Sequence, residues 1–196
     1  MKHMKKNDGY VMVYVMIVFT ILSFVAVSIC GMAVKNLQAQ KATINRMAAR
    51  YEAEAYLQEF IAQVSALDTV GTVNDADSEA SAEDAARDNM MSKFLVDAQN
   101  IAGTFVEEET AYLTLLEDST ASQFSVFVSD LSGTVQIETK MTVTITEKYF
   151  DKTVTEAEPK WYSCKATIEN VSIEYDSYDI SYQTVDGGGE EVPDET

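Results

Sequence analysis

The chain has 196 residues, of which 46% are hydrophobic, and a formal net charge of −18. It contains only two prolines and eight glycines, and β-branched and aromatic residues recur through its C-terminal half. This composition excludes a collagen-like chain and a wholly disordered one. The length suffices for one membrane element and one modest domain.

The charge is divided unevenly along the chain. Residues 1–50 hold seven basic side chains and one acidic side chain, a net charge of +6. Residues 51–196 hold seven basic and 31 acidic side chains, a net charge of −24. Nucleic-acid binding relies on Lys and Arg that displace counterions from phosphates. We therefore expect no nucleic acid to bind the acidic part.

Few side chains offer catalytic chemistry. The one histidine, His3, lies in a basic leader that we expect to be removed, so the mature chain would lack Ser-His-Asp, Cys-His and His-zinc sites. Cys30 and Cys164 form no CxxC motif, and we expect Cys164 to be a buried strand residue, with pairing between molecules as the alternative. We expect no enzymatic activity, cofactor or metal.

The most distinctive segment is residues 10–34, which contain no charged side chain. As a helix they would span about 37 Å, more than the ~30 Å hydrocarbon core of a bilayer. The sequence therefore predicts a membrane segment. Basic residues both precede it, at 2, 5 and 6, and follow it, at 35, 41, 46 and 50, so counting charges leaves its orientation open.

The membrane segment is open to several interpretations. A cleaved secretory signal would have a shorter apolar stretch, and a lipoprotein signal would have a small residue where Ile29 precedes Cys30. A plain uncleaved anchor explains the apolar run but not its flanks.

The N-terminal flank of the apolar run has a distinctive pattern. Residues 5–9, Lys-Lys-Asn-Asp-Gly, are followed by the aromatic Tyr10 and then by the apolar run. This pattern resembles a type III signal, as found in prepilins. The resemblance implies that a membrane prepilin peptidase cuts between Gly9 and Tyr10 on the cytoplasmic side. It also implies that the new N-terminus at Tyr10 is methylated.

A second segment with a family resemblance lies 41 residues beyond this junction. Tyr51, Ala53, Glu54 and Ala55 are similar to the Tyr-x-Ala-Glu-Ala segment of PilX-like minor pilins and their Gram-positive relatives. Together the two segments resemble the type IV pilin superfamily, and this resemblance covers residues 5 to about 60. It implies a filament subunit that contacts other pilin subunits through its N-terminal helix.

One position departs from the family pattern. Major pilins carry a glutamate at the fifth mature position, where this chain has Tyr14. In the family that glutamate is thought to neutralise the terminal amine of a neighbouring subunit, and an unpaired charge is costly in lipid. We therefore hypothesise a non-major subunit, at or near the tip or acting in initiation. An ordinary anchor with Tyr14 facing lipid is the alternative.

The helical pattern continues beyond the membrane segment. No Pro or Gly occurs between Met32 and Leu67, and apolar residues recur at steps of three and four. We predict one helix from residue 10 to about 67, divided into a membrane or filament-core part (10–34) and its continuation (35–68). The predicted apolar stripe comprises Leu37, Ile44, Met47, Ala48, Tyr51, Leu57, Phe60, Ile61, Val64 and Leu67. A juxtamembrane coiled coil is the alternative.

A polar break and a second helix are predicted next. Residues 71–81 read as a loop, and Ser81 with Asp84 predicts a capping box for a helix over 82–102 that Gly103 ends. Asp75, Asp77 and Glu79 form an acidic cluster, but the EF-hand glycine and the final glutamate are missing, so we expect no calcium site.

The remainder alternates with period two, which is typical of strands with one covered face. Apolar positions predict strands over 124–128, 137–145, 162–168, 171–175 and 178–182, with turns at 131–133 and at Asp176-Ser177. We predict an α+β, pilin-like fold in which the long helix covers an antiparallel sheet, in an acidic extracytoplasmic head (69–186). Residues 187–196 are expected to form a disordered acidic tail.

The favoured function is a structural minor pilin or pseudopilin of a type IV pilus or a type II secretion-like filament. Its precursor would cross the cytoplasmic membrane once, with the N-terminus inside. The alternatives are a single-pass anchored extracytoplasmic binding or sensor module and an enzyme that uses acidic residues.

Overall fold

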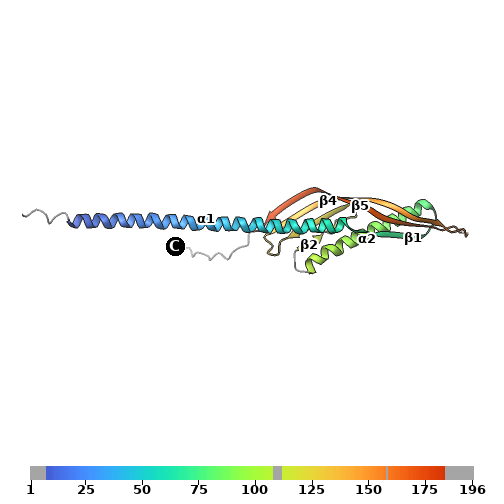
Figure 1. The fold of residues 1–196 in the computed structure, drawn as a ribbon, viewed down its shortest axis with the longest axis horizontal. Helices are drawn as coiled ribbons and strands as arrows, with labels where there is room; N and C mark the ends of the chain where they lie inside the picture. Colours follow the sequence, from blue (N-terminus) through green and yellow to red (C-terminus); the bar gives the residue numbers. More distant parts are fainter. Residues whose placement is uncertain (1–7, 108–111, 158, 184–196) are drawn as a thin grey trace, which may run out of the picture. The chain divides into compact units, whose positions relative to one another are not determined.

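A computed structural model describes residues 8–107, 112–157 and 159–183 (Figure 1). The element order is α1 (Asp8–Ser65), β1 (Val70–Ala76), α2 (Glu79–Glu107), β2 (Tyr112–Leu115), β3 (Gln123–Ser129), β4 (Val135–Val154) and β5 (Tyr162–Tyr182). The chain divides into an N-terminal unit, residues 1–47, and a C-terminal unit, residues 48–196. The predicted tail (187–196) and most of the predicted leader (1–9) lie outside the described residues.

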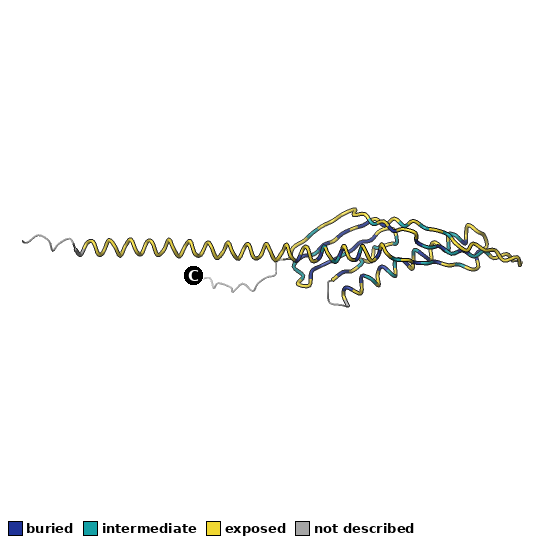
Figure 2. The backbone as a smooth tube through the Cα atoms, viewed as in Figure 1, coloured by how far each residue is buried: buried dark blue, intermediate teal, exposed yellow. Residues whose placement is uncertain are grey.

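The described part of the N-terminal unit is helical without a break. Every side chain from Tyr10 to Met47 is exposed, and α1 is drawn as exposed along this stretch in Figure 2. The hydroxyls of Thr20, Ser23 and Ser28 each donate to the carbonyl oxygen four residues earlier, at 2.8 Å. Polar groups that are satisfied within the helix allow it to enter an apolar environment.

Within the C-terminal unit, α1 presents a buried stripe at steps of three and four. This stripe consists of Ala49, Ala53, Leu57, Phe60 and Val64. The predicted stripe was correct at 57, 60 and 64, and the predicted Ile61 and Leu67 are partly buried against the core. The prediction was wrong at Ala48 and Tyr51, which are exposed, because in this part of the helix Ala49 and Ala53 face the sheet instead. The helix ends at Ser65, close to the predicted end near 67.

The predicted loop at 71–81 was wrong in part, because residues 70–76 form the edge strand β1. β1 pairs antiparallel with β5, from Val70 opposite Thr167 to Ala76 opposite Tyr162. Gly71 is buried against α2, and a Cβ placed there would lie 2.8 Å from the Cα of Met90 and closer still to two other backbone atoms of α2. The glycine that suggested a loop therefore permits close packing of strand and helix.

Helix α2 is longer than predicted at both ends. It begins at Glu79, and the hydroxyl oxygen of Ser78 accepts a hydrogen bond from the amide of Ser81 at 3.2 Å. Ser78 is thus the N-cap, and the predicted Ser81–Asp84 box was wrong. Gly103 does not end the helix, since the buried side chains of Ala102 and Phe105 hold it in place as far as residue 107.

The five strands form one antiparallel sheet in the order β1-β5-β4-β3-β2. The predicted turn at 131–133 is confirmed between β3 and β4, with Gly133 at a φ of +67°. The predicted turn at Asp176-Ser177 was wrong: β5 is continuous, and Asp176 is an extra residue between the Lys140–Ser177 and Met141–Tyr175 pairs. Local turn-forming residues here make a β-bulge. Strand β2 was not predicted.

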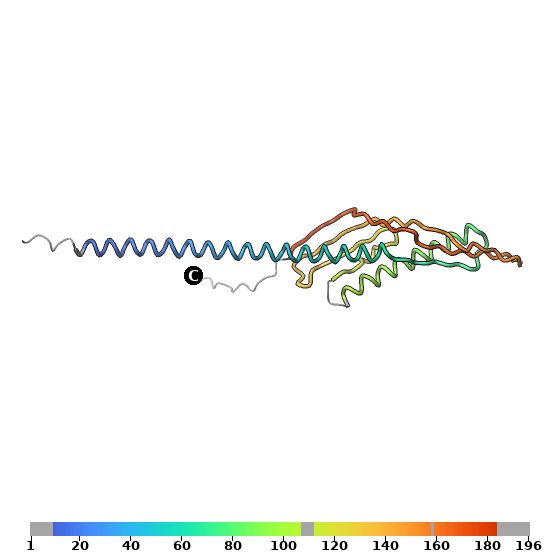
Figure 3. The backbone as a smooth tube through the Cα atoms, viewed as in Figure 1, coloured from blue at the N-terminus to red at the C-terminus, as the bar shows by residue number. Residues whose placement is uncertain are grey.

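Both helices cover the same face of the sheet. The ring of Phe124 on β3 lies 6.4 Å from that of Phe60 on α1 and 5.9 Å from that of Phe94 on α2. Figure 3 shows β4 and β5, which are consecutive in the chain, running side by side as an antiparallel pair. The opposite face carries exposed Glu138, Lys140 and Thr142, and we call it the uncovered face. The predicted α+β layout, with a long N-terminal helix on an antiparallel sheet, is confirmed.

Candidate functional site: the apolar helix and the Glu54 contacts

The predicted processing site lies at the start of α1. The helix begins at Asp8, so Gly9 and Tyr10 belong to its first turn. The side chain of Tyr10 is 83% exposed and that of Tyr14 is 71% exposed. Within the described part of the N-terminal unit nothing covers either ring, and the other apolar side chains of this stretch are also exposed.

The apolar stretch of α1 is the one candidate membrane span among the described residues. Its most apolar window has a mean hydropathy of 2.6, and none of that window is buried. Length and composition are sufficient to cross a bilayer. A run of exposed Val, Ile, Leu and Phe this long is not stable in water, so it needs lipid or other helices around it.

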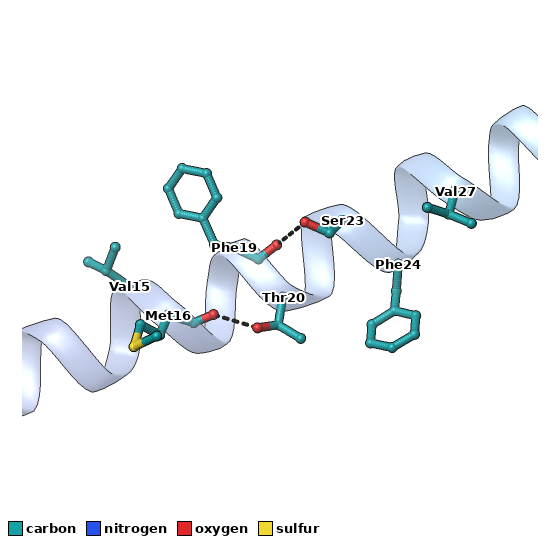
Figure 4. A pocket seen from close by; sticks show the side chains of 7 residues that line it. All are labelled: Val15, Met16, Phe19, Thr20, Ser23, Phe24 and Val27. Carbon is teal, nitrogen blue, oxygen red and sulfur yellow. Dashed lines mark hydrogen bonds between the residues drawn. The ribbon is translucent and has the colours of Figure 1, made fainter.

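A shallow groove runs along this stretch. Figure 4 shows its lining residues on a single segment of α1: Val15, Met16, Phe19, Thr20, Ser23, Phe24 and Val27. One helix supplies every wall, so the groove is an open flank rather than an enclosed cavity. Thr20 and Ser23 donate to the carbonyl oxygens of Met16 and Phe19, which leaves the flank apolar in character. The geometry suits contact with another apolar surface rather than capture of a small molecule.

The residues of the predicted motif have different environments within the C-terminal unit. Ala53 is fully buried in the core, whereas Tyr51 and Ala55 are exposed. Glu54 is half-buried at the edge of the contact between α1 and β5. The short side chain at 53 lets the helix approach the sheet closely, and the glutamate beside it is placed to reach across to a strand.

Glu54 joins α1 to β5 through a polar network. Its carboxylate accepts a 2.7 Å bond from Nε of Arg50, one turn earlier, and a 3.0 Å bond from the hydroxyl of Tyr178 on β5. One turn later, Nε2 of Gln58 donates to the hydroxyl oxygen of Tyr175 at 3.3 Å. The two tyrosine rings meet edge to face at 5.9 Å. Arg50 and Glu54 lie one turn apart on the same helix, whereas the two tyrosines are over a hundred residues away in the sequence and were not predicted.

The network lowers the pKa of Glu54 and raises the pKa of Tyr178. The hydrogen bond from Arg50 lowers the pKa of Glu54, which favours the charged carboxylate. Burial, reinforced by the hydrogen bond and charge of Glu54, raises the pKa of Tyr178 to about 12. At neutral pH the tyrosine therefore keeps its proton and donates it to an ionised glutamate.

An open groove of about 470 Å³ lies beside this network. Its lining includes Tyr51, Gln58, Tyr175 and Tyr178. It has no nucleophile paired with a base, so its residues do not form a recognisable catalytic arrangement.

The other candidate sites from the sequence are separated by the fold. Asp75 lies on β1, whereas Glu79 opens α2 and pairs with Lys152 at 3.8 Å. Among the described residues, no group of three His, Cys, Asp or Glu side chains could hold a metal ion. Cys164 is buried on β5, as predicted, and burial raises the pKa of its thiol, whereas Cys30 is exposed on α1.

Comparison with protein-family models, with curated proteins and with solved structures finds no match for this chain.

Proposed function

We propose that this protein is a minor pilin or pseudopilin. It is made as a single-pass membrane precursor with its N-terminus inside and is cut after Gly9 by a prepilin peptidase. It then enters a type IV pilus or a type II secretion-like filament through its apolar helix. The observation that carries the proposal is the exposed apolar segment of α1, which needs lipid before assembly and other subunits' helices afterwards.

Two features of the chain support an assembling subunit. The helix that carries the apolar segment, α1, also supplies the buried stripe from Ala49 to Val64 in the C-terminal unit. Within that unit, the Glu54 network and the Phe60–Phe124 contact join residues 54–60 of α1 to the sheet. A separate anchor would need no such packing.

The direct test is the mass of the native N-terminus. In cells with an active prepilin peptidase, we expect a chain that begins at methylated Tyr10. Gly9→Val should retain the leader, because the peptidase recognises the glycine, and the chain should disappear from sheared filaments. Gly31→Val is the matched control: position 31 has no heavy atom within 4 Å of an added Cβ, so cleavage should continue.

The alternative is an uncleaved anchor that carries an extracytoplasmic binding module. Recovery of an intact Met1 leader from such cells would establish the anchor and refute the pilin proposal. A pilin precursor and an uncleaved anchor would both be found in membrane fractions, so localisation alone does not discriminate between the two hypotheses.

Position 14, where this chain has tyrosine in place of the glutamate of major pilins, suggests where the subunit lies in the filament. A subunit without that carboxylate has nothing to pair with a neighbour's terminal amine, so we propose that it sits at or near the tip or starts assembly. Immunogold labelling should place the native protein at filament ends and Tyr14→Glu along the shaft as well. Native protein found along the whole shaft would refute the tip position.

A further inference from the structure

The end of the β4–β5 hairpin differs from the rest of the C-terminal unit in charge and in exposed side chains. Residues 148–165 hold four of the seven basic side chains found in residues 51–196 and only three of the 31 acidic ones. The same stretch contains the one tryptophan of the chain, Trp161. With a net charge of 4 − 3 = +1, this end of the hairpin lacks the strong negative charge of the rest of the unit.

The strand register places several of these side chains on the uncovered face. Phe150 lies directly opposite Lys165, and Lys148 lies opposite Thr167. Nζ of Lys148 is 5.3 Å from the centroid of the Phe150 ring. Trp161 comes immediately before β5, whose first residue is Tyr162, and it lies four positions before Lys165 in the sequence. We call Lys148, Phe150, Trp161 and Lys165 the hairpin patch.

The two rings of the hairpin patch are partly exposed. Phe150 is 40% exposed and Trp161 is 39% exposed. Trp161 closes the hairpin with backbone atoms only, because its amide donates to the hydroxyl of Thr155 and its carbonyl accepts from the amide of Thr155. Any residue with an amide proton could make those bonds. The indole is therefore free to serve an interaction, as exposed aromatic rings rimmed by polar groups commonly do.

The lysines of the hairpin patch are available to an anion. Lys148 makes only a long contact, 3.9 Å, with the exposed Glu169, and Lys165 forms no ion pair within the part of the chain that the structure describes. Lys152, by contrast, turns towards the covered side and pairs with Glu79 and Glu83 of α2. A bulge between Phe150 and Thr153, where Asp151 has a φ of +52°, permits this turn.

These contacts hold the hairpin patch in place before any ligand arrives. Lys152 ties the hairpin to the first turns of α2, and the hydroxyls of Thr153 and Ser163 are bonded across the strands. A preorganised surface loses less conformational entropy on binding. The backbone that carries the two rings and the two lysines of the patch is thus held by contacts within the C-terminal unit.

The charge around the hairpin patch selects the kind of ligand. DNA carries about one negative charge per 1.7 Å, and the acidic surface beyond the hairpin would repel so dense a polyanion within a Debye length of about 8 Å. A polymer of uronic acids carries one carboxylate per sugar ring, a lower charge density than that of duplex DNA, and it offers apolar ring faces to Phe150 and Trp161 and carboxylates to the lysines. We propose that the hairpin patch binds an acidic polysaccharide. The proposal does not depend on the filament function, since both rings lie in the C-terminal unit.

The test uses the full chain in detergent micelles and immobilised polygalacturonate, with neutral dextran and oligo(dT) as reference polymers. We expect binding to polygalacturonate alone, weakened by raising NaCl from about 50 to about 500 mM. Trp161→Ala should weaken binding about tenfold, as expected for an aromatic anchor. Lys165→Gln should weaken it several-fold and reduce its dependence on salt.

Matched controls separate the hairpin patch from general effects. Tyr112→Ala removes an exposed ring on β2 and Lys93→Gln an exposed cation on α2, and neither should change binding. Absence of polygalacturonate binding, equal losses in control and patch variants, or equally tight binding of oligo(dT) would each overturn the proposal. Thermal unfolding followed by circular dichroism checks that Trp161→Ala is folded, and Lys165→Gln tests the patch without removing a ring.

The outcome is independent of the filament proposal. Trp161→Ala should still be cut after Gly9 and should still enter filaments. Polysaccharide binding by a chain that retains its leader would leave this inference standing and refute the pilin function alone.

Discussion

Glu54 shows how one carboxylate connects two distant segments. It bonds Arg50 on its own helix and Tyr178 on β5. We predict that Glu54→Ala lowers the free energy of unfolding by about 1 kcal/mol, because a partly exposed charged hydrogen bond is lost. Glu59→Ala, on the exposed side of α1, should change it by less than about 0.5 kcal/mol. Chemical denaturation of the full chain in detergent measures both, and equal effects would contradict the role of Glu54.

The raised pKa of Tyr178 predicts a loss of stability in alkali. In the unfolded chain the phenol loses its proton near pH 10, whereas in the folded chain it keeps it until about pH 12, because of burial and the nearby Glu54. The unfolded state therefore gains stability as the pH rises through this window. Tyr178→Phe should show a smaller fall in melting temperature between pH 10 and 12. The exposed Tyr112→Phe should behave as wild type, and an unchanged fall in Tyr178→Phe would refute the assignment.

At the scale of elements, the packing of β1 on α2 depends on Gly71. A Cβ at this position would collide with the backbone at Ala86 and Met90, which cannot move as a side-chain tip can. We predict that Gly71→Ala lowers the free energy of unfolding by more than about 2 kcal/mol. Gly103→Ala is the matched control inside α2, with nothing within 4 Å, and should raise it by about 0.5–1 kcal/mol. Denaturant titrations measure both free energies of unfolding. An unchanged value for Gly71→Ala would contradict this packing.

The elements also show where sequence patterns suffice. The uninterrupted apolar helix and the alternating strands were predictable, because each reflects a periodicity set by the backbone. β1 and the bulge at Asp176 were not, since Gly, Asn and Asp at 71–75 and Asp-Ser at 176–177 are typical of turns. Pairing with β5 and with β4 overrides those local preferences. The candidate site divides in the same way: Gly9, Tyr10, Tyr14 and Glu54 came from sequence, whereas Tyr175, Tyr178 and the hairpin patch required the register.

At the scale of the whole molecule, the net charge predicts how stability depends on salt. The formal charge of −18 implies repulsion among carboxylates in the folded state. Raising NaCl from about 20 to about 500 mM shortens the Debye length and should raise the melting temperature by a few degrees. At pH 4, where many carboxylates are protonated, the same addition of NaCl should raise the melting temperature by less. A melting temperature that is independent of salt at neutral pH would show that repulsion does not limit stability.

The sequence by itself determined that this chain has a membrane-length apolar helix, an acidic remainder and an antiparallel α+β layout. Those properties depend on composition and on local periodicity, which need no knowledge of distant contacts. Only the tertiary structure decided which face of α1 is buried, that Glu54 meets Tyr178, and that Phe150 and Lys165 stand side by side. Such pairings join residues far apart in the chain, and they are fixed by strand register and by close packing, neither of which a local pattern contains.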